Sequence, residues 1–256
     1  MTAPLTTLGR QVGWEQRSYW RNPAAAAFTF AFPLLFLVIF VALNGNSRVS
    51  LSGGDVRFAQ YYVPAIVSFG LISACYTNLA FTICNRRERG LLKRMRGTPL
   101  SPGLYLGGVF GNVLVVAVIL TGLVIALGLL FYGVTWPGRY LALLAVTVTG
   151  AFCFSALGVA VSTFVPNEDA APAIINFILF PLLFISGTFG EVASDSFLGR
   201  LAAIFPVRHL ITSMVAVFDP FVTGTGVRFS DLAVMLAWGI AGVIVSLRRF
   251  RWEPYR

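Results

Sequence analysis

The residues best placed for specific chemistry form a basic run in the middle of the chain, from Arg86 to Pro102. If the run is helical, Leu91, Leu92 and Met95 fall on one side, and basic side chains cover most of the rest. A small apolar edge surrounded by basic side chains suits insertion into a groove with an acidic rim on a soluble partner. The alternative interpretation is an anchor that touches only lipid headgroups. The residues predicted to dock are Arg86, Arg87, Glu88, Arg89, Gly90, Leu91, Leu92, Lys93 and Met95.

Catalytic and metal-binding patterns are missing from the rest of the chain. The only lysine, Lys93, lies inside the basic run, so there is no phosphate-binding loop with a Gly-Lys-Ser/Thr ending. The only histidine, His209, has no second metal-binding residue beside it, and we expect it to be structural. A membrane-embedded enzyme would need clustered His, Asp or Glu, which the sequence lacks. We therefore expect no catalytic residue and no metal site.

The surrounding sequence has the composition of a membrane protein. Hydrophobic residues make up 57% of the chain and charged residues 11%, whereas soluble domains carry roughly 25% charged residues. A helix needs ~20 mostly apolar residues to cross a bilayer. This criterion predicts an all-α, polytopic fold with six transmembrane helices. The predicted spans are Ala24–Leu43, Tyr62–Cys84, Tyr105–Tyr132, Tyr140–Val165, Ala171–Phe189 and Leu232–Leu247.

The distribution of Arg and Lys predicts the orientation of these spans. With six spans, both termini and the loop 85–103 lie on one side, and that side carries most of the basic residues. The excess places the termini and the loop in the cytoplasm. The membrane is expected to be the plasma membrane. The net charge of +9 then reflects topology and contact with membrane lipids, and we expect no binding to nucleic acid.

Two segments outside the spans are predicted to form helices that do not cross the membrane. In residues 1–23, Leu5, Leu8, Val12, Tyr19 and Trp20 share one helical face, and Arg17 lies on a basic stripe opposite. This pattern predicts a helix lying in the membrane interface, with a solvated tail as the alternative. The rest of the chain, 24–256, forms the six-span domain.

The second such segment, 190–229, is predicted to hold short extracellular re-entrant helices. A seventh span there is the alternative, and it would move the C-terminus to the other side.

The fifth span has the residues best suited to line a transport path. Its phenylalanines recur at helical spacing, and a central proline can act as a hinge. Packing against lipid or neighbouring helices is the default interpretation of such a stripe. The candidate path residues are Asn176, Phe177, Phe180, Pro181, Phe184 and Ser186.

The order of several motifs resembles type-two ABC exporter permeases, the multidrug-resistance and polysaccharide-export class. The basic run through Pro102 resembles their cytoplasmic loop, and Asn167–Ala171 resembles their turn between spans four and five. Phe180–Gly187 is similar to their proline-to-serine-glycine exit, and Phe205–His209 to their extracellular segment. The loop after Gly187 departs from the family, because it lacks the frequent proline-tryptophan pair.

The resemblance implies a mechanism and a set of partners. Two permease subunits, identical or different, would pair with two soluble ABC ATPase subunits that bind Mg-ATP, and this chain would carry no cofactor itself. Residues 86–96 would form the coupling helix on the ATPase. The cargo would be an amphipathic drug, as in antibiotic resistance, or a lipid-like compound. The alternatives are a lipid-linked polysaccharide and a non-transporting membrane scaffold for an ATPase.

Overall fold

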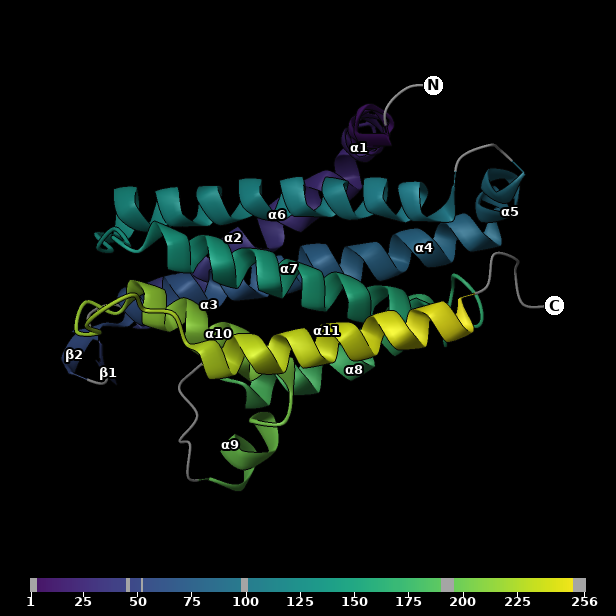
Figure 1. Cartoon of the computed structure of the whole chain (residues 1–256). Coiled ribbons are helices and arrows are strands. Elements are labelled where there is room, and N and C mark those ends of the chain that lie inside the picture. The colour runs from purple at the N-terminus through teal and green to yellow at the C-terminus, as the bar shows by residue number, and fades with distance from the viewer. Residues whose placement is uncertain (1–3, 45–46, 52, 98–100, 190–195, 251–256) are drawn as a thin grey trace.

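The computed structural model of the chain is almost entirely helical (Figure 1). It describes residues 4–44, 47–51, 53–97, 101–189 and 196–250. The elements, in chain order, are α1 (Pro4–Trp20), α2 (Pro23–Asn44), β1 (Arg48–Leu51), β2 (Gly54–Arg57), α3 (Phe58–Ile72), η1 (Ser73–Asn78), α4 (Leu79–Glu88), α5 (Leu91–Arg96), α6 (Pro102–Tyr132), α7 (Tyr140–Ser162), α8 (Ala171–Ile185), α9 (Phe197–Ala202), α10 (Pro206–Phe218) and α11 (Phe229–Arg249).

Within the described residues, five helices are long and apolar enough to cross a membrane. They are α2, the continuous helix α3–η1–α4, α6, α7 and α11. The predicted fifth span, Ala171–Phe189, is different: α8 has 15 residues and ends at Ile185, below the ~20 needed for a full crossing. The helix stops there because Gly187 adopts a positive φ of 90°, a conformation that glycine accommodates without strain.

The segment that contains α8 nevertheless contacts both ends of the long helix α3–η1–α4. Before α8, Glu168 accepts a hydrogen bond from Asn85 at 3.0 Å. After α8, the Gly187 carbonyl accepts one from the Tyr61 hydroxyl at 2.8 Å. Asn85 lies near the end of α4 and Tyr61 near the start of α3. Residues 168–187 therefore extend from near one end of that helix to near the other.

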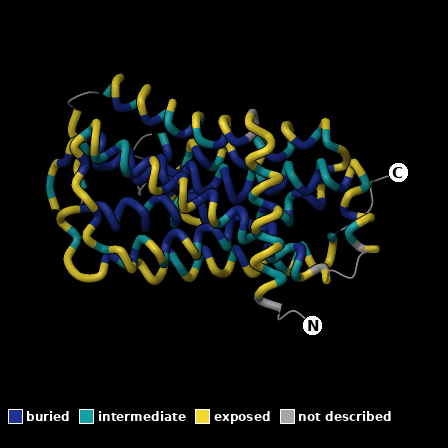
Figure 2. The backbone as a smooth tube through the Cα atoms, turned by 90° about the horizontal axis from the view of Figure 1, so that it is seen from above, coloured by how far each residue is buried: buried dark blue, intermediate teal, exposed yellow. Residues whose placement is uncertain are grey.

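The centre of the bundle is α3, all of whose residues are buried. Helices α2, α6, α7 and α10 contact it, and Figure 2 shows the buried backbone along the middle of the bundle. Large apolar side chains on the outer faces of α2, α7 and α11 are exposed, among them Leu43, Leu141 and Leu247. An apolar surface of this extent is typical of helices that face lipid.

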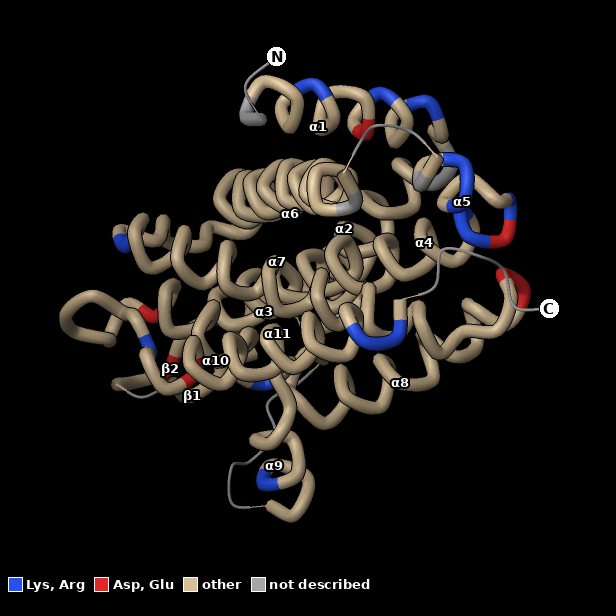
Figure 3. Tube along the Cα trace, turned by 45° about the vertical axis from the view of Figure 1, so that its right-hand side comes forward, with Lys and Arg blue, Asp and Glu red and all other residues tan. Residues whose placement is uncertain are grey.

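The two ends of the bundle differ in charge. Lys and Arg are concentrated at the end of the bundle that holds α5 and the last turn of α11, as Figure 3 shows. We call it the basic end. The opposite end holds the antiparallel hairpin β1–β2, in which Arg48 pairs with Arg57; we call it the hairpin end.

Two short helices follow α8 where the sequence predicts them. Helix α9 begins at a Ser196 cap, whose hydroxyl accepts from the Gly199 amide. Helix α10 begins with Pro206 at its first position and is largely buried against α3, α7 and α11. Residues 190–195, the start of the predicted re-entrant segment, lie outside the described residues, and its re-entrant character stays a prediction.

Candidate functional site: the basic end and an aromatic cleft

The basic run folds into a tight corner between α4 and α5. Gly90 joins the two helices in a left-handed conformation with φ 66°, which glycine adopts far more readily than other residues. Its amide donates to the Arg87 carbonyl at 3.0 Å, and its carbonyl accepts from the Arg94 amide at 3.2 Å. The corner therefore presents the last turn of α4 and the short α5 together at the basic end.

Arg86 of this corner points into the protein. Its guanidinium forms a bidentate ion pair with Glu15 of α1, at 2.6 and 3.0 Å, and donates to the Tyr105 hydroxyl of α6 at 2.9 Å. Paired N–H donors on a carboxylate give both strength and a fixed orientation. Arg86 thus joins α1, α4 and α6 at one point.

Arg87 is even more deeply enclosed, with 1% of its surface exposed. It donates to the carbonyl of Ser162, the last residue of α7, at 2.8 Å, and to that of Val165 just beyond. The last carbonyls of a helix have no partner within the helix, so Arg87 supplies donors to the end of α7 and ties it to α4.

These contacts turn part of the predicted docking surface towards the interior of the protein, and docking itself stays a prediction. Both arginines make contacts within the chain: Arg86 with Glu15, and Arg87 with the end of α7. The predicted apolar edge is also divided: Leu92 is completely buried, Met95 packs against the core, and Leu91 is 41% exposed. We call the exposed remainder the outer corner; it consists of Glu88, Arg89, Leu91, Lys93 and Arg94.

Helix α1 lies across the first turns of α6 (Figures 1 and 3). Leu8 and Val12, on the predicted apolar face of this helix, contact α6 at Gly107 and Gly111. A Cβ added to Gly111 would lie 2.6 Å from a Val12 methyl group, so the close approach requires glycine there.

The remaining residues predicted for the interfacial helix have varied surroundings. Trp20 stacks on Phe30 with ring centroids 5.6 Å apart, and Tyr19 is half-buried. Arg17 is exposed and lies over the Trp14 ring at 5.6 Å. The side chain of Leu5 lies outside the described residues. An interfacial position for this helix stays a prediction.

An aromatic cleft of about 400 Å³ lies between α2, the long helix α3–η1–α4 and α8. Its phenylalanines are Phe28, Phe32, Phe69, Phe81 and Phe180. Its polar side chains are Thr29, Ser73, Thr77, Asn78 and Asn176. A mostly apolar hollow with a few polar groups is the usual form of a small-molecule site.

The cleft brings together only some of the predicted path residues. Asn176 and Phe180 line it. Phe177 and Phe184 of α8 point outward with 80% and 64% exposed, Pro181 is exposed, and Ser186 is buried.

Sequence reasoning missed the contribution of η1 to this cleft. Ser73, Thr77 and Asn78 belong to this π-helical segment, and such wide turns occur often at functional sites. The available signal was these three polar residues close together in the middle of a mostly apolar predicted span.

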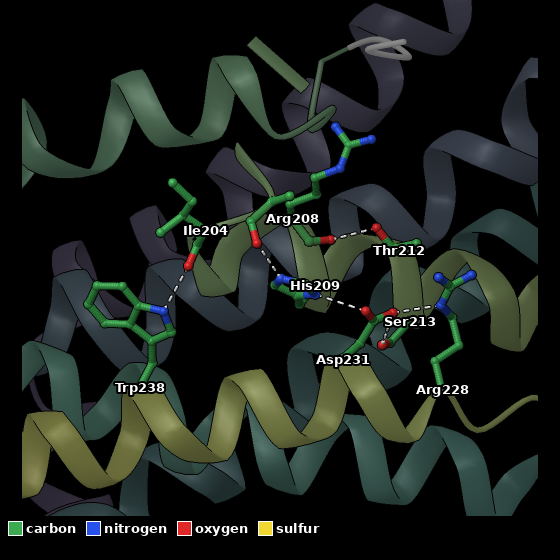
Figure 4. Close-up of polar contacts among 9 residues, drawn as sticks. Ile204, Arg208, His209, Thr212, Ser213, Arg228, Asp231 and Trp238 are labelled. Atoms are coloured by element: carbon green, nitrogen blue, oxygen red, sulfur yellow. Dashed lines mark hydrogen bonds and ion pairs between the residues drawn. The ribbon is translucent and has the colours of Figure 1, made fainter. Parts of the chain in front are cut away.

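A polar cluster ties α10 to α11 (Figure 4). His209 contacts the Asp231 carboxylate through Nδ1 and the Ala203 carbonyl through Nε2, both at 2.8 Å. Asp231 also accepts from Arg228 at 2.6 Å and from Ser213 at 3.3 Å. Neutral imidazole has only one N–H, so donating to both acceptors requires the imidazolium.

The surroundings of His209 favour this charged form. The hydrogen bond to Asp231 raises the pKa of His209 above its ordinary value, despite partial burial, which acts in the opposite direction. Among the described residues, no group of three or more His, Cys, Asp or Glu is placed to hold a metal ion. His209 therefore serves as a cationic link between α10 and α11.

These features first define a class: a polytopic helical membrane protein with an aromatic cleft between its helices and a basic corner at one end. The family model described as ABC-2 type transporter matches residues 12–218, and the chain belongs to this family. It is therefore a membrane subunit of an ABC transporter, a class that associates with an ABC ATPase subunit. A search among curated proteins found no match.

Proposed function

We propose that this chain is the membrane subunit of an exporter that moves an amphipathic drug or lipid-like compound out of the cell. A separate subunit would hydrolyse Mg-ATP. The observation that carries the proposal is the aromatic cleft, whose phenylalanines suit an apolar body and whose few hydroxyl and amide groups suit one polar end. A lipid-linked polysaccharide is the second candidate cargo. A scaffold that only recruits an ATPase would need no such cleft.

The proposed topology has six crossings, with the basic end in the cytoplasm. The support is that residues 168–187 extend from near one end of α3–η1–α4, at Asn85, to near the other, at Tyr61. Counting this segment as a crossing places both termini on the side of the basic corner. The excess of Arg and Lys there agrees with a cytoplasmic side of the plasma membrane.

The complete transporter would contain two permease subunits, identical or different, and two ATPase subunits. The outward-facing rings of Phe177 and Phe184 on α8 leave an apolar surface beside the cleft for a second permease. We assign the ATPase contact to the outer corner, where Leu91 projects among Arg89, Lys93 and Arg94. The Glu15–Arg86 ion pair would carry movement from this corner to α1.

The docking assignment is tested by reversing charge at Arg89 and Lys93 to glutamate. The amount of ABC ATPase that co-purifies with the chain should fall at least tenfold relative to the wild type. The reason is that the substitutions place negative charge against a groove with an acidic rim. The matched control is the double reversal of Arg248 and Arg249, two exposed arginines at the end of α11. Membrane insertion should be unchanged in both variants. Retention of the ATPase by the corner variant would remove the docking assignment.

A further inference from the structure

A second cleft, of about 370 Å³, lies at the basic end between α1, α4, α6 and the start of α8. We call it the polar cleft, because charged, amide and hydroxyl side chains make up much of its wall. The long helix α3–η1–α4 contributes a polar stripe to this wall, in which Asn78, Thr82, Asn85 and Arg89 recur every three or four residues. Such spacing places the four side chains on one helical face, with Arg89 nearest the basic end.

Of the four charged side chains in this wall, two neutralise each other. Arg86 is paired with Glu15 at 2.6 Å. Arg89 makes no hydrogen bond or ion pair within the part of the chain that the structure describes, and the Glu168 carboxylate accepts only from the neutral amide of Asn85 there, at 3.0 Å. Arg89 is exposed and Glu168 is half-buried. The polar cleft therefore offers a ligand one guanidinium and one carboxylate.

This pair of charges selects a zwitterion. A nucleotide or another polyanion would meet the carboxylate of Glu168, and a simple cation would meet the guanidinium of Arg89. A phosphate suits the planar donors of a guanidinium. A primary ammonium has three N–H donors for a carboxylate, whereas a quaternary ammonium has none. Phosphate and primary ammonium together make the phosphoethanolamine group.

The wall becomes apolar further from the basic end, where Leu79 and Phe81 of α4 face Val109 and Val113 of α6. Residues 82–89 of α4 extend about 10 Å along the helix axis, at 1.5 Å per residue, which is comparable with the headgroup layer of ~5–8 Å on each side of a bilayer. A soluble zwitterion would leave the apolar part of the wall against water. A phospholipid would cover it with the first carbons of its acyl chains.

We infer that the polar cleft binds the headgroup of a phosphatidylethanolamine-type phospholipid from the membrane leaflet at the basic end. Arg89 binds the phosphate, and Glu168 accepts hydrogen bonds from the ammonium. The acyl chains pass Phe81 and Val113 into the bilayer. This lipid is a resident ligand that joins α4 to the segment before α8, so the inference goes beyond the proposed function, which concerns the exported cargo.

The test uses the full chain in phosphatidylcholine nanodiscs without any ATPase or cargo. Three photoreactive phospholipids carry the same acyl chains with a diazirine and differ in headgroup: ethanolamine, choline or glycerol. Each is added at the same low fraction, and labelled peptides are identified by mass spectrometry. The ethanolamine probe should label peptides of α4 and α6 about fivefold more than either other probe. Excess glycerophosphoethanolamine, which has the headgroup but no acyl chains, should not compete.

Glu168→Gln tests the ammonium contact. The substitution keeps an oxygen that can accept from Asn85 and removes the negative charge, so labelling by the ethanolamine probe should fall to the level of the choline probe. Asp169→Asn is the matched control, because Asp169 is the exposed acidic neighbour of Glu168 and does not line the polar cleft. This control should retain the preference for ethanolamine.

Arg89→Gln tests the phosphate contact. All three probes contain the phosphate, so the substitution should weaken labelling by all of them about threefold or more. Arg94→Gln is the matched control, since Arg94 is an exposed arginine of α5 that does not line the polar cleft. Unchanged labelling in the Arg89 variant would remove the phosphate contact and with it the inference.

Equal labelling of the wild type by the three probes would overturn the inference, as would the same preference in the Glu168 and Asp169 variants. Strongest labelling by the glycerol probe would show an anionic headgroup, and complete competition by glycerophosphoethanolamine would show that the acyl chains contribute nothing; either result would also overturn it. Because neither ATPase nor cargo is present, these outcomes leave the export proposal and the docking assignment intact.

Discussion

Arg86 and Arg87 are neighbours in the sequence with different partners. Successive helical residues point about 100° apart, so Arg86 reaches Glu15 and Tyr105 whereas Arg87 reaches the end of α7. The sequence predicted that the run is basic and helical, but not which charges turn inward. The partners are 71 and 75 residues distant in the chain, and local periodicity contains no information about such contacts.

His209 makes the stability of the chain sensitive to pH. Its folded pKa is raised, so its contribution is fully present below the unfolded pKa, near 6.5. The contribution is lost as pH rises through the higher folded value. The charged side chains that face the ring are Asp231, which accepts from it, Arg228, which donates to Asp231, and Arg208. Loss of this contribution should lower the free energy of unfolding by about 1 kcal/mol. We therefore expect the melting temperature in detergent to fall by roughly 2–4 °C between pH 6 and pH 9.

The control for this prediction is His209→Gln, which removes the only histidine of the chain. The variant should melt at a nearly constant temperature between pH 6 and pH 9. A wild-type melting temperature that does not change over this range would contradict a cationic link between α10 and α11.

At the scale of elements, the glycines on α6 determine where α1 lies. Gly107 and Gly111 stand one turn apart, and Leu8 and Val12, also one turn apart on α1, occupy the space that side chains would fill. The amphipathic pattern of α1 was visible in the sequence. The face that it buries was not, because an apolar stripe suits either lipid or a glycine-lined helix.

Gly111→Val should displace α1, because the added Cβ would lie 2.6 Å from a Val12 methyl group. We expect trypsin to cleave after Arg10 and Arg17 several times faster than in the wild type. Gly122→Val, on the same helix, is the control, since an added Cβ there meets nothing within 4 Å. Equal cleavage rates in the two variants would show that the glycines do not hold α1.

At the scale of the whole molecule, hydropathy predicted five helices that are long enough to cross a membrane. It also predicted the position of the sixth apolar segment, which contains α8. It placed the end of that segment at Phe189, beyond the end of α8 at Ile185, because hydropathy does not register the turn that Gly187 makes with its positive φ. The aromatic cleft was beyond prediction from the sequence alone, since it combines side chains from α2, the long helix α3–η1–α4 and α8. Of the residues that line it, only Asn176 and Phe180 were predicted as path residues.

The proposed six-crossing topology predicts the side on which the C-terminus lies. An epitope tag after Arg256 should resist external protease in intact cells and become accessible once the membrane is permeabilised. A tag inserted in the hairpin β1–β2 should be cleaved in intact cells and serves as the control. Cleavage of the C-terminal tag from outside would show an odd number of crossings.

The π-helical turn η1 determines how far the two halves of the long helix α3–η1–α4 are rotated relative to each other about the helix axis. A π-helical turn absorbs one more residue than an α-helical turn. If Ser73–Asn78 closed into the α-helical pattern, everything after it would swing about the helix axis by about 100° relative to α3. Arg87 would lose its contacts with the carbonyls at the end of α7, and Leu92 would leave its buried site. Six residues near the middle of the bundle thus determine which way the outer corner, some 15 residues later, presents its charges.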